Sequence, residues 1–324
     1  MKILIILPNW LGDAVMATPA IELLASYYPN AKFTFVGSYV SIEALKYHPL
    51  CKNAVVDETK KAKSRIKATY DLAKKLGSFD MAISFRNQIH SSLLLKLTGT
   101  FFSVAKKSWH SMFLLSHTPA IKADKHLSMQ YAELAMINTD EWNKITPNLR
   151  LYIEPKKFEK PTMGINAGAT YGSAKRWYPQ RFAEVAREFS DRYEIIIFGG
   201  PNEVEMANEI ESHLKSSHVT NYTNLAGKTS IKELCSYIGG CSLFVTNDSG
   251  PMHVAAAYGV PSVSIFGPTK HTETSQWMNE KSTIVRHDME CAPCMRRECP
   301  LGHHECMKSI TAHEVIEAVK ELNI

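Results

Sequence analysis

Short apolar runs alternate with amphipathic stretches along most of the chain. Residues 2–7 form a run of isoleucine and leucine after one lysine, and residues 14–28 carry apolar side chains at helical spacing. Between these two stretches lies a polar loop that contains Gly12 and Asp13. This segment predicts a buried strand, a loop and a helix.

The same alternation continues through the first half of the chain. We expect further strands at residues 32–37, 54–56 and 81–85, and helices at residues 41–47 and 63–76. Strands that alternate with helices indicate a parallel sheet with right-handed crossovers.

Residues 147–161 are rich in lysine and proline, and they predict a linker. The pattern then restarts, with strands expected at residues 162–166, 194–198, 243–246 and 262–266 and helices at residues 179–190, 203–214, 230–238 and 252–258. The sequence therefore predicts an α/β protein of two doubly wound, Rossmann-like domains, residues 1–157 and 158–324, that face each other across a central cleft.

Length and composition agree with a globular enzyme of two domains. A chain of 324 residues exceeds the usual size of one hydrophobic core. Its 45% hydrophobic and 21% charged residues exclude disordered and fibrous classes. The first apolar run is too short for a signal peptide, and no apolar run approaches the roughly 18 residues that span a bilayer. We therefore expect a cytoplasmic protein whose seven cysteines are reduced.

The net charge of +5 is distributed unevenly. Residues 1–160 contain 22 Lys and Arg against 13 Asp and Glu, a charge of +9, which leaves −4 for the rest of the chain. A basic half suits an anionic partner such as nucleic acid, a phosphorylated sugar or an acidic lipid surface. A lysine-rich solvated surface explains the same count equally well.

Asp13 occupies the loop after the first predicted strand, where open α/β sheets place their ligands. An ionised carboxylate there can accept a proton from an acceptor hydroxyl. The alternative is a helix N-cap without a chemical role, and position alone favours the cap.

Two loops in the second half are typical of phosphate sites. The first, residues 166–177, consists of small residues followed by Lys175 and Arg176, so that backbone N–H groups and two cations surround an anion. It matches neither a P-loop nor a GxGxxG fingerprint, and the alternative is a flexible surface turn. The second, residues 246–253, begins a helix at Ser249 and Gly250, where a diphosphate would bind.

Two residues of the second loop, Asp248 and His253, each have two interpretations. Asp248 would orient the loop or reach a sugar hydroxyl, because a carboxylate sits poorly against phosphate. His253 either contacts the donor or is only a packed helix residue.

Cysteines gather near the C-terminus together with two histidines: Cys291, Cys294, Cys299, Cys306, His303 and His304. The first pair has zinc-binding spacing, but the second pair does not match a finger or a ribbon. Packed free thiols are favoured over a structural metal, and a disulfide is least expected.

Basic and aromatic residues alternate between residues 101 and 115: Lys106, Lys107 and His110 with Phe102, Trp109, Phe113 and Leu114. This mixture suits contact with anionic lipid headgroups. A buried amphipathic helix with a solvated lysine pair is slightly favoured as the alternative.

Four separated motifs, taken in order, resemble those of the ADP-heptose:lipopolysaccharide heptosyltransferases of glycosyltransferase family 9, most closely the heptosyltransferase II branch. The resemblance covers nearly the whole chain. It rests on residues 9–13 with Ala17-Thr18-Pro19, on residues 168–177, on residues 247–257 and on the cysteine-containing residues 291–306.

The resemblance implies a GT-B fold with an N-terminal acceptor domain and a C-terminal donor domain. It also implies inverting transfer of L-glycero-D-manno-heptose from ADP-heptose to the first heptose of the lipopolysaccharide or lipooligosaccharide inner core, without metal or cofactor. By motif match, Asp13 is the catalytic base, which overrides the preference for a cap. Lys175 neutralises the departing diphosphate, with Thr170 and the amides of Ser249 and Gly250.

The same match gives the other site residues and the partners. Donor-binding residues are Thr170, Tyr171, Arg176, Glu203, Thr229, Asp248, Ser249, Gly250 and His253, and acceptor-binding residues are Asn9, Trp10 and Gly12. The implied acceptor is an anionic heptosyl-Kdo-lipid A, met by a cytoplasmic enzyme that is peripheral on the cytoplasmic face of the inner membrane. Nucleic acid is not an expected partner.

Other functions remain open at this point. Within the family, heptosyltransferase I or another GT-B lipopolysaccharide-core glycosyltransferase is the alternative. A nucleotide-sugar epimerase of the same fold would leave the basic first half unexplained. A zinc-stabilised nucleic-acid-binding protein would use the cysteines and the basic half. A dinucleotide oxidoreductase is less favoured, because neither loop has its glycines.

Overall fold

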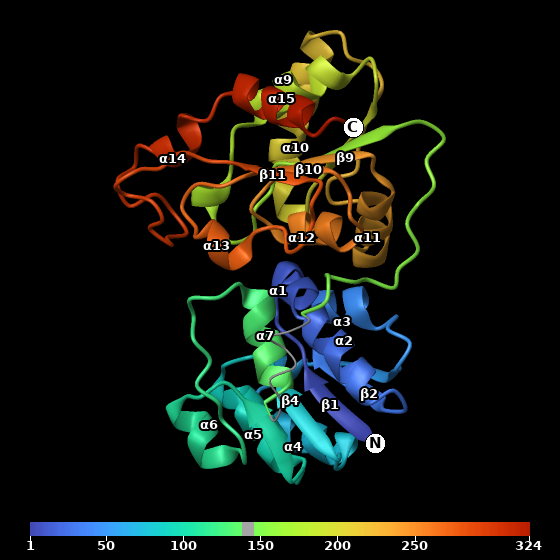
Figure 1. The fold of residues 1–324 in the computed structure, drawn as a ribbon, viewed down its shortest axis with the longest axis vertical. Coiled ribbons are helices and arrows are strands. Elements are labelled where there is room, and N and C mark those ends of the chain that lie inside the picture. Colours follow the sequence, from blue (N-terminus) through green and yellow to red (C-terminus); the bar gives the residue numbers. More distant parts are fainter. Residues whose placement is uncertain (138–145) are drawn as a thin grey trace. The chain divides into compact units, whose positions relative to one another are not determined.

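A computed structural model describes residues 1–137 and 146–324 (Figure 1). The chain divides into two compact units, Met1–Tyr152 and Ile153–Ile324. The division falls inside the stretch rich in lysine and proline but before residue 157, where the sequence analysis ends the first domain. Residues 153–157 join the second unit because the Lys156 N–H donates to the Ser236 carbonyl (2.8 Å) and the Tyr258 hydroxyl donates to the Ile153 carbonyl (2.7 Å).

The first unit is built on a five-stranded parallel sheet in the order β3-β2-β1-β4-β5. Its strands are β1 (Lys2–Ile6), β2 (Lys32–Gly37), β3 (Cys51–Val56), β4 (Met81–Ser84) and β5 (Phe102–Ala105). Strands β1, β2 and β4 are buried almost throughout, which agrees with their continuous apolar runs.

The helices of the first unit form two groups in Figure 1, and each group packs within itself. One comprises α1 (Leu11–Met16), α2 (Thr18–Tyr27), α3 (Tyr39–Leu45) and α7 (Leu127–Ala135), and the other α4 (Arg65–Leu76), α5 (Ile89–Leu97) and α6 (Trp109–Leu114), after the 3₁₀ turn η1 (Thr59–Lys61). The single helix expected over residues 14–28 is wrong. It is divided at Ala17, because Pro19 stands in the first turn of α2 and cannot continue the hydrogen bonds of α1.

The second unit is built on a six-stranded parallel sheet in the order β11-β10-β9-β6-β7-β8. Its strands are β6 (Thr162–Asn166), β7 (Glu194–Phe198), β8 (Tyr222–Asn224), β9 (Leu243–Asn247), β10 (Ser262–Ile265) and β11 (Ser282–Val285).

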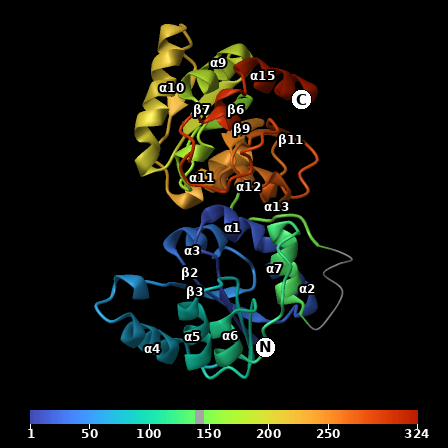
Figure 2. The ribbon, with the colours of Figure 1, turned by 90° about the vertical axis from the view of Figure 1, so that its left-hand side faces the viewer.

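Helices α9 and α10 pack together, as do α11 and α12, and α15 packs on α9 (Figure 2). The helices are α9 (Pro179–Phe189), α10 (Val204–Ser216), α11 (Ile231–Gly240), α12 (Gly250–Ala257), α13 (His271–Thr274), α14 (Glu305–Lys308) and α15 (Ala312–Glu321), with the 3₁₀ turns η2 (Ser173–Lys175) and η3 (Pro201–Glu203).

Each sheet has the doubly wound order in which the first strand lies beside the fourth. In the first unit the order reverses between β1 and β4, and in the second between β6 and β9. Open sheets of this kind bind ligands outside the carboxyl ends of the strands at the reversal. The loops after these four strands are therefore the candidate ligand-binding loops. No helix of the described residues is long and apolar enough to cross a membrane.

Candidate functional site

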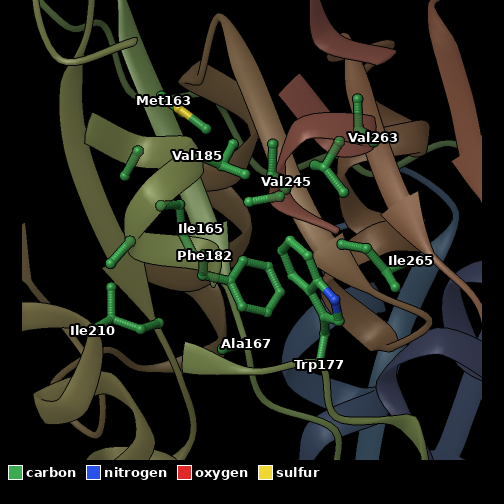
Figure 3. Close-up of a cluster of buried hydrophobic side chains, with 14 of the residues drawn as sticks. Met163, Ile165, Ala167, Trp177, Phe182, Val185, Ile210, Val245, Val263 and Ile265 are labelled. Atoms are coloured by element: carbon green, nitrogen blue, oxygen red, sulfur yellow. The ribbon is translucent and has the colours of Figure 1, made fainter. Parts of the chain in front are cut away.

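The phosphate loop, residues 166–177, joins β6 to the core of the second unit. Its last residue, Trp177, is buried among core side chains and packs edge-on against Phe182 (Figure 3). The indole Nε1 of Trp177 donates to the Ile310 carbonyl (3.0 Å), and its backbone N–H donates to Asn247 Oδ1 (3.0 Å). The loop is therefore held firmly at its end, and the alternative of a flexible surface turn is not supported.

Lys175 and Asp248, which the sequence analysis selected separately, form an ion pair. Lys175 Nζ lies 2.6 Å from Asp248 Oδ2, and their side chains are only 12% and 4% exposed. The Thr269 hydroxyl donates to the same carboxylate oxygen (2.5 Å), and the ammonium lies 4.8 Å from the centre of the Tyr171 ring. Asp248 thus holds the cation in place, which gives the carboxylate a role beside the predicted phosphate loop.

The second predicted loop lies directly beside the first. Ser249 is the N-cap residue of α12, and its hydroxyl is 3.3 Å from Asn166 Nδ2 and 3.2 Å from Thr246 Oγ1. Asn247 Nδ2 donates to the Ala167 carbonyl (2.5 Å). The N-terminus of α12 carries the positive end of the helix dipole. It lies beside the phosphate loop, so the two form one site where the strand order reverses, between β6 and β9.

Glu203 also belongs to this site. A Cβ atom on Gly168 would lie 2.1 Å from the Glu203 carboxyl carbon, so the Glu203 carboxylate lies directly against the backbone of the phosphate loop. The carboxylate accepts the Gly200 N–H (2.7 Å), which fixes it beside the loop. His253 is buried in α12.

The other residues predicted to bind the donor are less enclosed. Arg176 donates from Nε to the Ala169 carbonyl (3.4 Å), Thr170 is exposed, and Thr229 is half-buried in the segment that follows β8.

In the first unit, Asp13 lies in the first turn of α1. The helix begins at Leu11 with Trp10 in the N-cap position, so Asp13 is not the N-cap, and that interpretation is wrong. Gly12 is buried, whereas Asn9 and Trp10 are exposed. Burial and the negative charge of Asp13 hold the pKa of Tyr131, on α7, well above its usual value of 10.0.

The sequence analysis missed a large pocket in the first unit, with a volume of about 1210 Å³. Asn9 and Trp10 line it, together with basic and aromatic residues from the loops after β2, β3 and β4 and from α6, among them Tyr39, Lys60, Lys61, Arg65, Arg86, His90 and Trp109. The signal was present, because polar residues follow two of the predicted strands, at 57–61 and 86–88.

Arg86 lies at a buried position in this pocket and is only 7% exposed. It donates from Nε to the Leu7 carbonyl (2.5 Å), and its Nη1 pairs with Asp57 Oδ2 (3.1 Å). Within the described part of the chain, its Nη2 has no hydrogen-bond partner.

Asp57 is the buried counter-ion of Arg86. Burial alone would raise the pKa of Asp57, but hydrogen bonds from His90 and Thr59, together with the Arg86 charge, hold it below its ordinary value. The carboxylate is therefore ionised, and the pair presents one buried, unsatisfied N–H donor of Arg86.

The seven cysteines are free thiols. The four near the C-terminus, with His303 and His304, line one small pocket of about 20 Å³. Among the described residues, no three His, Cys, Asp or Glu side chains are placed to hold a metal ion.

The segment between residues 101 and 115 is not a buried amphipathic helix, so that alternative is wrong. Phe101, Trp109 and Phe113 are 90%, 68% and 82% exposed. Helix α6 instead buries its polar residues His110 and Ser111, and His110 Nδ1 lies 3.1 Å from the Ser92 hydroxyl of α5. The side chains of Phe101, Trp109 and Phe113 therefore all face solvent.

Comparisons with known proteins agree with this arrangement. The family model described as "Glycosyltransferase family 9 (heptosyltransferase)" matches residues 69–305. A Campylobacter jejuni protein named "Lipooligosaccharide heptosyltransferase 2" is 40% identical over 334 residues, covering 100% of this chain and 99% of its own. A Haemophilus influenzae protein of the same name is 30% identical over 99% of both chains. The solved structure of E. coli ADP-heptose lps heptosyltransferase II has a TM-score of 0.82 at 26% identity and covers 99% of this chain and 98% of that one.

Proposed function

The chain belongs to glycosyltransferase family 9, the heptosyltransferases, and from that premise we propose that it transfers L-glycero-D-manno-heptose from ADP-heptose to the first heptose of a lipopolysaccharide or lipooligosaccharide inner core. The observation that carries the proposal is the 40% identity, over the whole chain, to a relative named for that second heptosyl transfer. The acceptor in this proposal is inferred from the relative, and the mechanism is inferred from the geometry of the site.

The second unit is the proposed donor unit. The diphosphate of ADP-heptose lies against the phosphate loop, with Lys175, Thr170, Tyr171 and the amides of Ser249 and Gly250 as its ligands. Lys175 is already fixed by its ion pair with Asp248 (2.6 Å), so stabilising the leaving group requires little reorganisation. These groups supply the positive potential that another enzyme would take from a metal ion.

The remaining donor contacts are proposed for Arg176, Glu203, Thr229, Asp248 and His253. Glu203 and Thr229 would contact the nucleoside, and Asp248 and His253 the sugar side of the donor. The close approach of Gly168 to Glu203 supports the first of these, because it brings the carboxylate to the edge of the phosphate loop.

Asp13 is the proposed catalytic base. The acceptor hydroxyl oxygen attacks the anomeric carbon, the bond from that carbon to the diphosphate oxygen breaks, and ADP leaves with the electron pair. Asp13 takes the hydroxyl proton, and the anomeric configuration inverts because one displacement occurs. Its place in the first turn of α1, directly after the pocket residues Asn9 and Trp10, supports this role.

The pocket of the first unit is the proposed acceptor site. Asn9, Trp10 and Gly12 belong to the loop that leads to Asp13, and two of them line the pocket. Lys60, Lys61 and Arg65 at the pocket suit the phosphate and carboxylate groups of a heptosyl-Kdo-lipid A. The unsatisfied Nη2 of Arg86 would donate to such an oxygen.

The aromatic surface of Phe101, Trp109 and Phe113 is proposed to contact the cytoplasmic face of the inner membrane. Trp109 lies both on this surface and at the pocket, so lipid contact would bring the membrane-embedded acceptor to its site. Lys96 and Lys107, both exposed and close in the chain, would add attraction to anionic headgroups.

A series of three acceptors tests the function. Core lipopolysaccharides with no heptose, one heptose and two heptoses are each incubated with ADP-heptose, and ADP release is measured. We expect turnover with the one-heptose acceptor and little with the others. Turnover only with the heptose-free acceptor would instead establish heptosyltransferase I, and turnover with none would reject the proposed acceptor. The one-heptose acceptor without its phosphates tests the basic residues of the pocket. Its KM should be higher than that of the phosphorylated one-heptose acceptor.

A further inference from the structure

The cysteine-rich segment, residues 291–306, binds directly to the phosphate loop through its backbone. The Tyr171 hydroxyl donates to the Met295 carbonyl (2.8 Å), and the Ala174 N–H donates to the Arg297 carbonyl (3.0 Å). A Cβ atom on Gly172 would lie 2.2 Å from that same Arg297 carbonyl oxygen. The two segments are therefore in van der Waals contact with no room for an intervening side chain.

His304 makes the contact nearest to Lys175. Its Nε2 lies 2.9 Å from the carbonyl of Ala174, the residue before Lys175, and its Nδ1 lies 3.2 Å from the Tyr178 hydroxyl. Because a carbonyl only accepts, Nε2 carries the proton and Nδ1 accepts from the tyrosine. One imidazole therefore joins the two ends of the short segment that carries Lys175.

The backbone at His304 is in the left-handed region, with φ of +56°. A non-glycine residue adopts this conformation only where its surroundings hold it. Backbone hydrogen bonds on both sides provide such a constraint: the Gly302 N–H donates to the Cys299 carbonyl (3.2 Å), and the Lys308 N–H donates to the His304 carbonyl (2.9 Å). Backbone N–H groups, first that of His304, also lower the pKa of the Cys299 thiol below its usual value of 9.0.

The pocket of four thiols lies beside this contact, and Ala174 lines it together with Cys299 and His304. A connected path thus leads from the thiols to the catalytic cation. It runs from Cys299, which shares the pocket with His304, through the imidazole to Ala174, and along the chain to Lys175.

We propose that the cysteine-rich segment is the positioning element of the phosphate loop, in which Cys299 holds His304 and His304 sets the position of Lys175. The inference rests on the proposed function in one respect, that Lys175 binds the diphosphate of the donor. It gives the cysteines a task in donor binding, and it makes the Cys299 thiol a site where covalent modification weakens that binding.

The test compares His304→Ala with His303→Ala in the full chain. His303 is a matched control, because it lines the same pocket but its exposed ring accepts from the local Glu305 N–H (3.0 Å) and, among the described residues, makes no hydrogen bond to the phosphate loop. Calorimetry with ADP measures the Kd, and thermal unfolding measures the Tm. We expect His304→Ala to raise the Kd roughly five- to tenfold, the effect of losing one hydrogen bond that fixes the loop. His303→Ala should leave it unchanged.

His304→Gln separates positioning from folding. Its side-chain NH2 group can still donate to the Ala174 carbonyl. It has no nitrogen acceptor at the place of the imidazole Nδ1, so the hydrogen bond from the Tyr178 hydroxyl is lost. Donor affinity should therefore recover in part, whereas the Tm should follow that of His304→Ala. A Kd that follows the Tm across the three variants would overturn the inference.

The thiol is tested with Cys299→Ala against Cys51→Ala, which removes a half-buried thiol from β3 of the first unit. Only Cys299→Ala should weaken ADP binding, and alkylation of Cys299 by iodoacetamide should have the same effect.

Lys175→Ala distinguishes failure of the proposed donor site from failure of this inference. If Lys175→Ala leaves the ADP Kd unchanged, the proposed donor role fails. If Lys175→Ala weakens ADP but Cys299→Ala and His304→Ala do not, only this inference fails.

Discussion

At the scale of single residues, the chemistry depends on groups brought together from loops that are distant in the sequence. Lys175 and Asp248 were each selected from their own loop, but their ion pair follows only from the adjacency of β6 and β9. Asp57 and Arg86 also form an ion pair, although they follow β3 and β4, which are not neighbours in the sheet, and both were missed altogether. Local patterns identify ligand-binding loops, but they do not show which side chains of two loops meet.

Asp13 has the sharpest prediction at this scale. Asp13→Asn keeps the size of the side chain but removes the proton acceptor, so kcat should fall at least about a hundredfold. The Kd for ADP should not change, because the donor contacts are proposed for the second unit. Turnover and ADP calorimetry of the same preparation make the comparison. An Asp13→Asn enzyme with wild-type kcat would refute the assignment of the base.

At the scale of elements, the apolar runs located the central strands of both sheets. Strands β1, β2 and β4 and strands β6, β7, β9 and β10 lie within one or two residues of the predicted ranges. These strands are buried on both faces, and most of their residues are apolar, so their sequences are easily recognised.

Of the four edge strands, only β3 was located, and only in part, as residues 54–56 of Cys51–Val56. Strands β5, β8 and β11 were missed, and β8 and β11 are short and only partly buried, with polar residues such as Thr223, Asn224 and Ser282. Helix α15 was also missed, although Thr311 and Glu314 form a capping box at its start. Such elements are stabilised by what they pack against more than by their own apolar pattern.

Helix α6 carries the prediction that belongs to this scale. Its buried face is polar and its exposed face is aromatic, so the aromatic side chains can be buried only against a binding partner. Trp109→Ala combined with Phe113→Ala should reduce binding to phosphatidylcholine vesicles that contain anionic phosphatidylglycerol. Sedimentation with the vesicles measures it, and salt should weaken the binding that remains.

Tyr27→Ala is the control for this experiment, because it removes an exposed aromatic ring from α2, in the other group of helices. Equal vesicle binding by the wild type, the double variant and the control would remove the membrane surface from the account. It would leave the transfer reaction untouched.

At the scale of the whole molecule, two parallel sheets of the same winding order repeat one architecture within the chain. The charge differs between the halves, with +9 in residues 1–160 and −4 in the rest. The basic half contains the pocket of about 1210 Å³, and the other half contains the phosphate loop. Composition left an anionic partner and a solvated lysine-rich surface equally open for the first half. Four of its basic residues line the pocket: Lys60, Lys61, Arg65 and Arg86.

One measurement tests the central claim most directly. The one-heptose core lipopolysaccharide is incubated with ADP-L-glycero-β-D-manno-heptose in excess EDTA, and the product is analysed by mass spectrometry and by NMR of the new anomeric centre. The account predicts a gain of one heptose with the opposite anomeric configuration to the donor. Retained configuration, a requirement for metal, or ADP release without a gain in mass would contradict it.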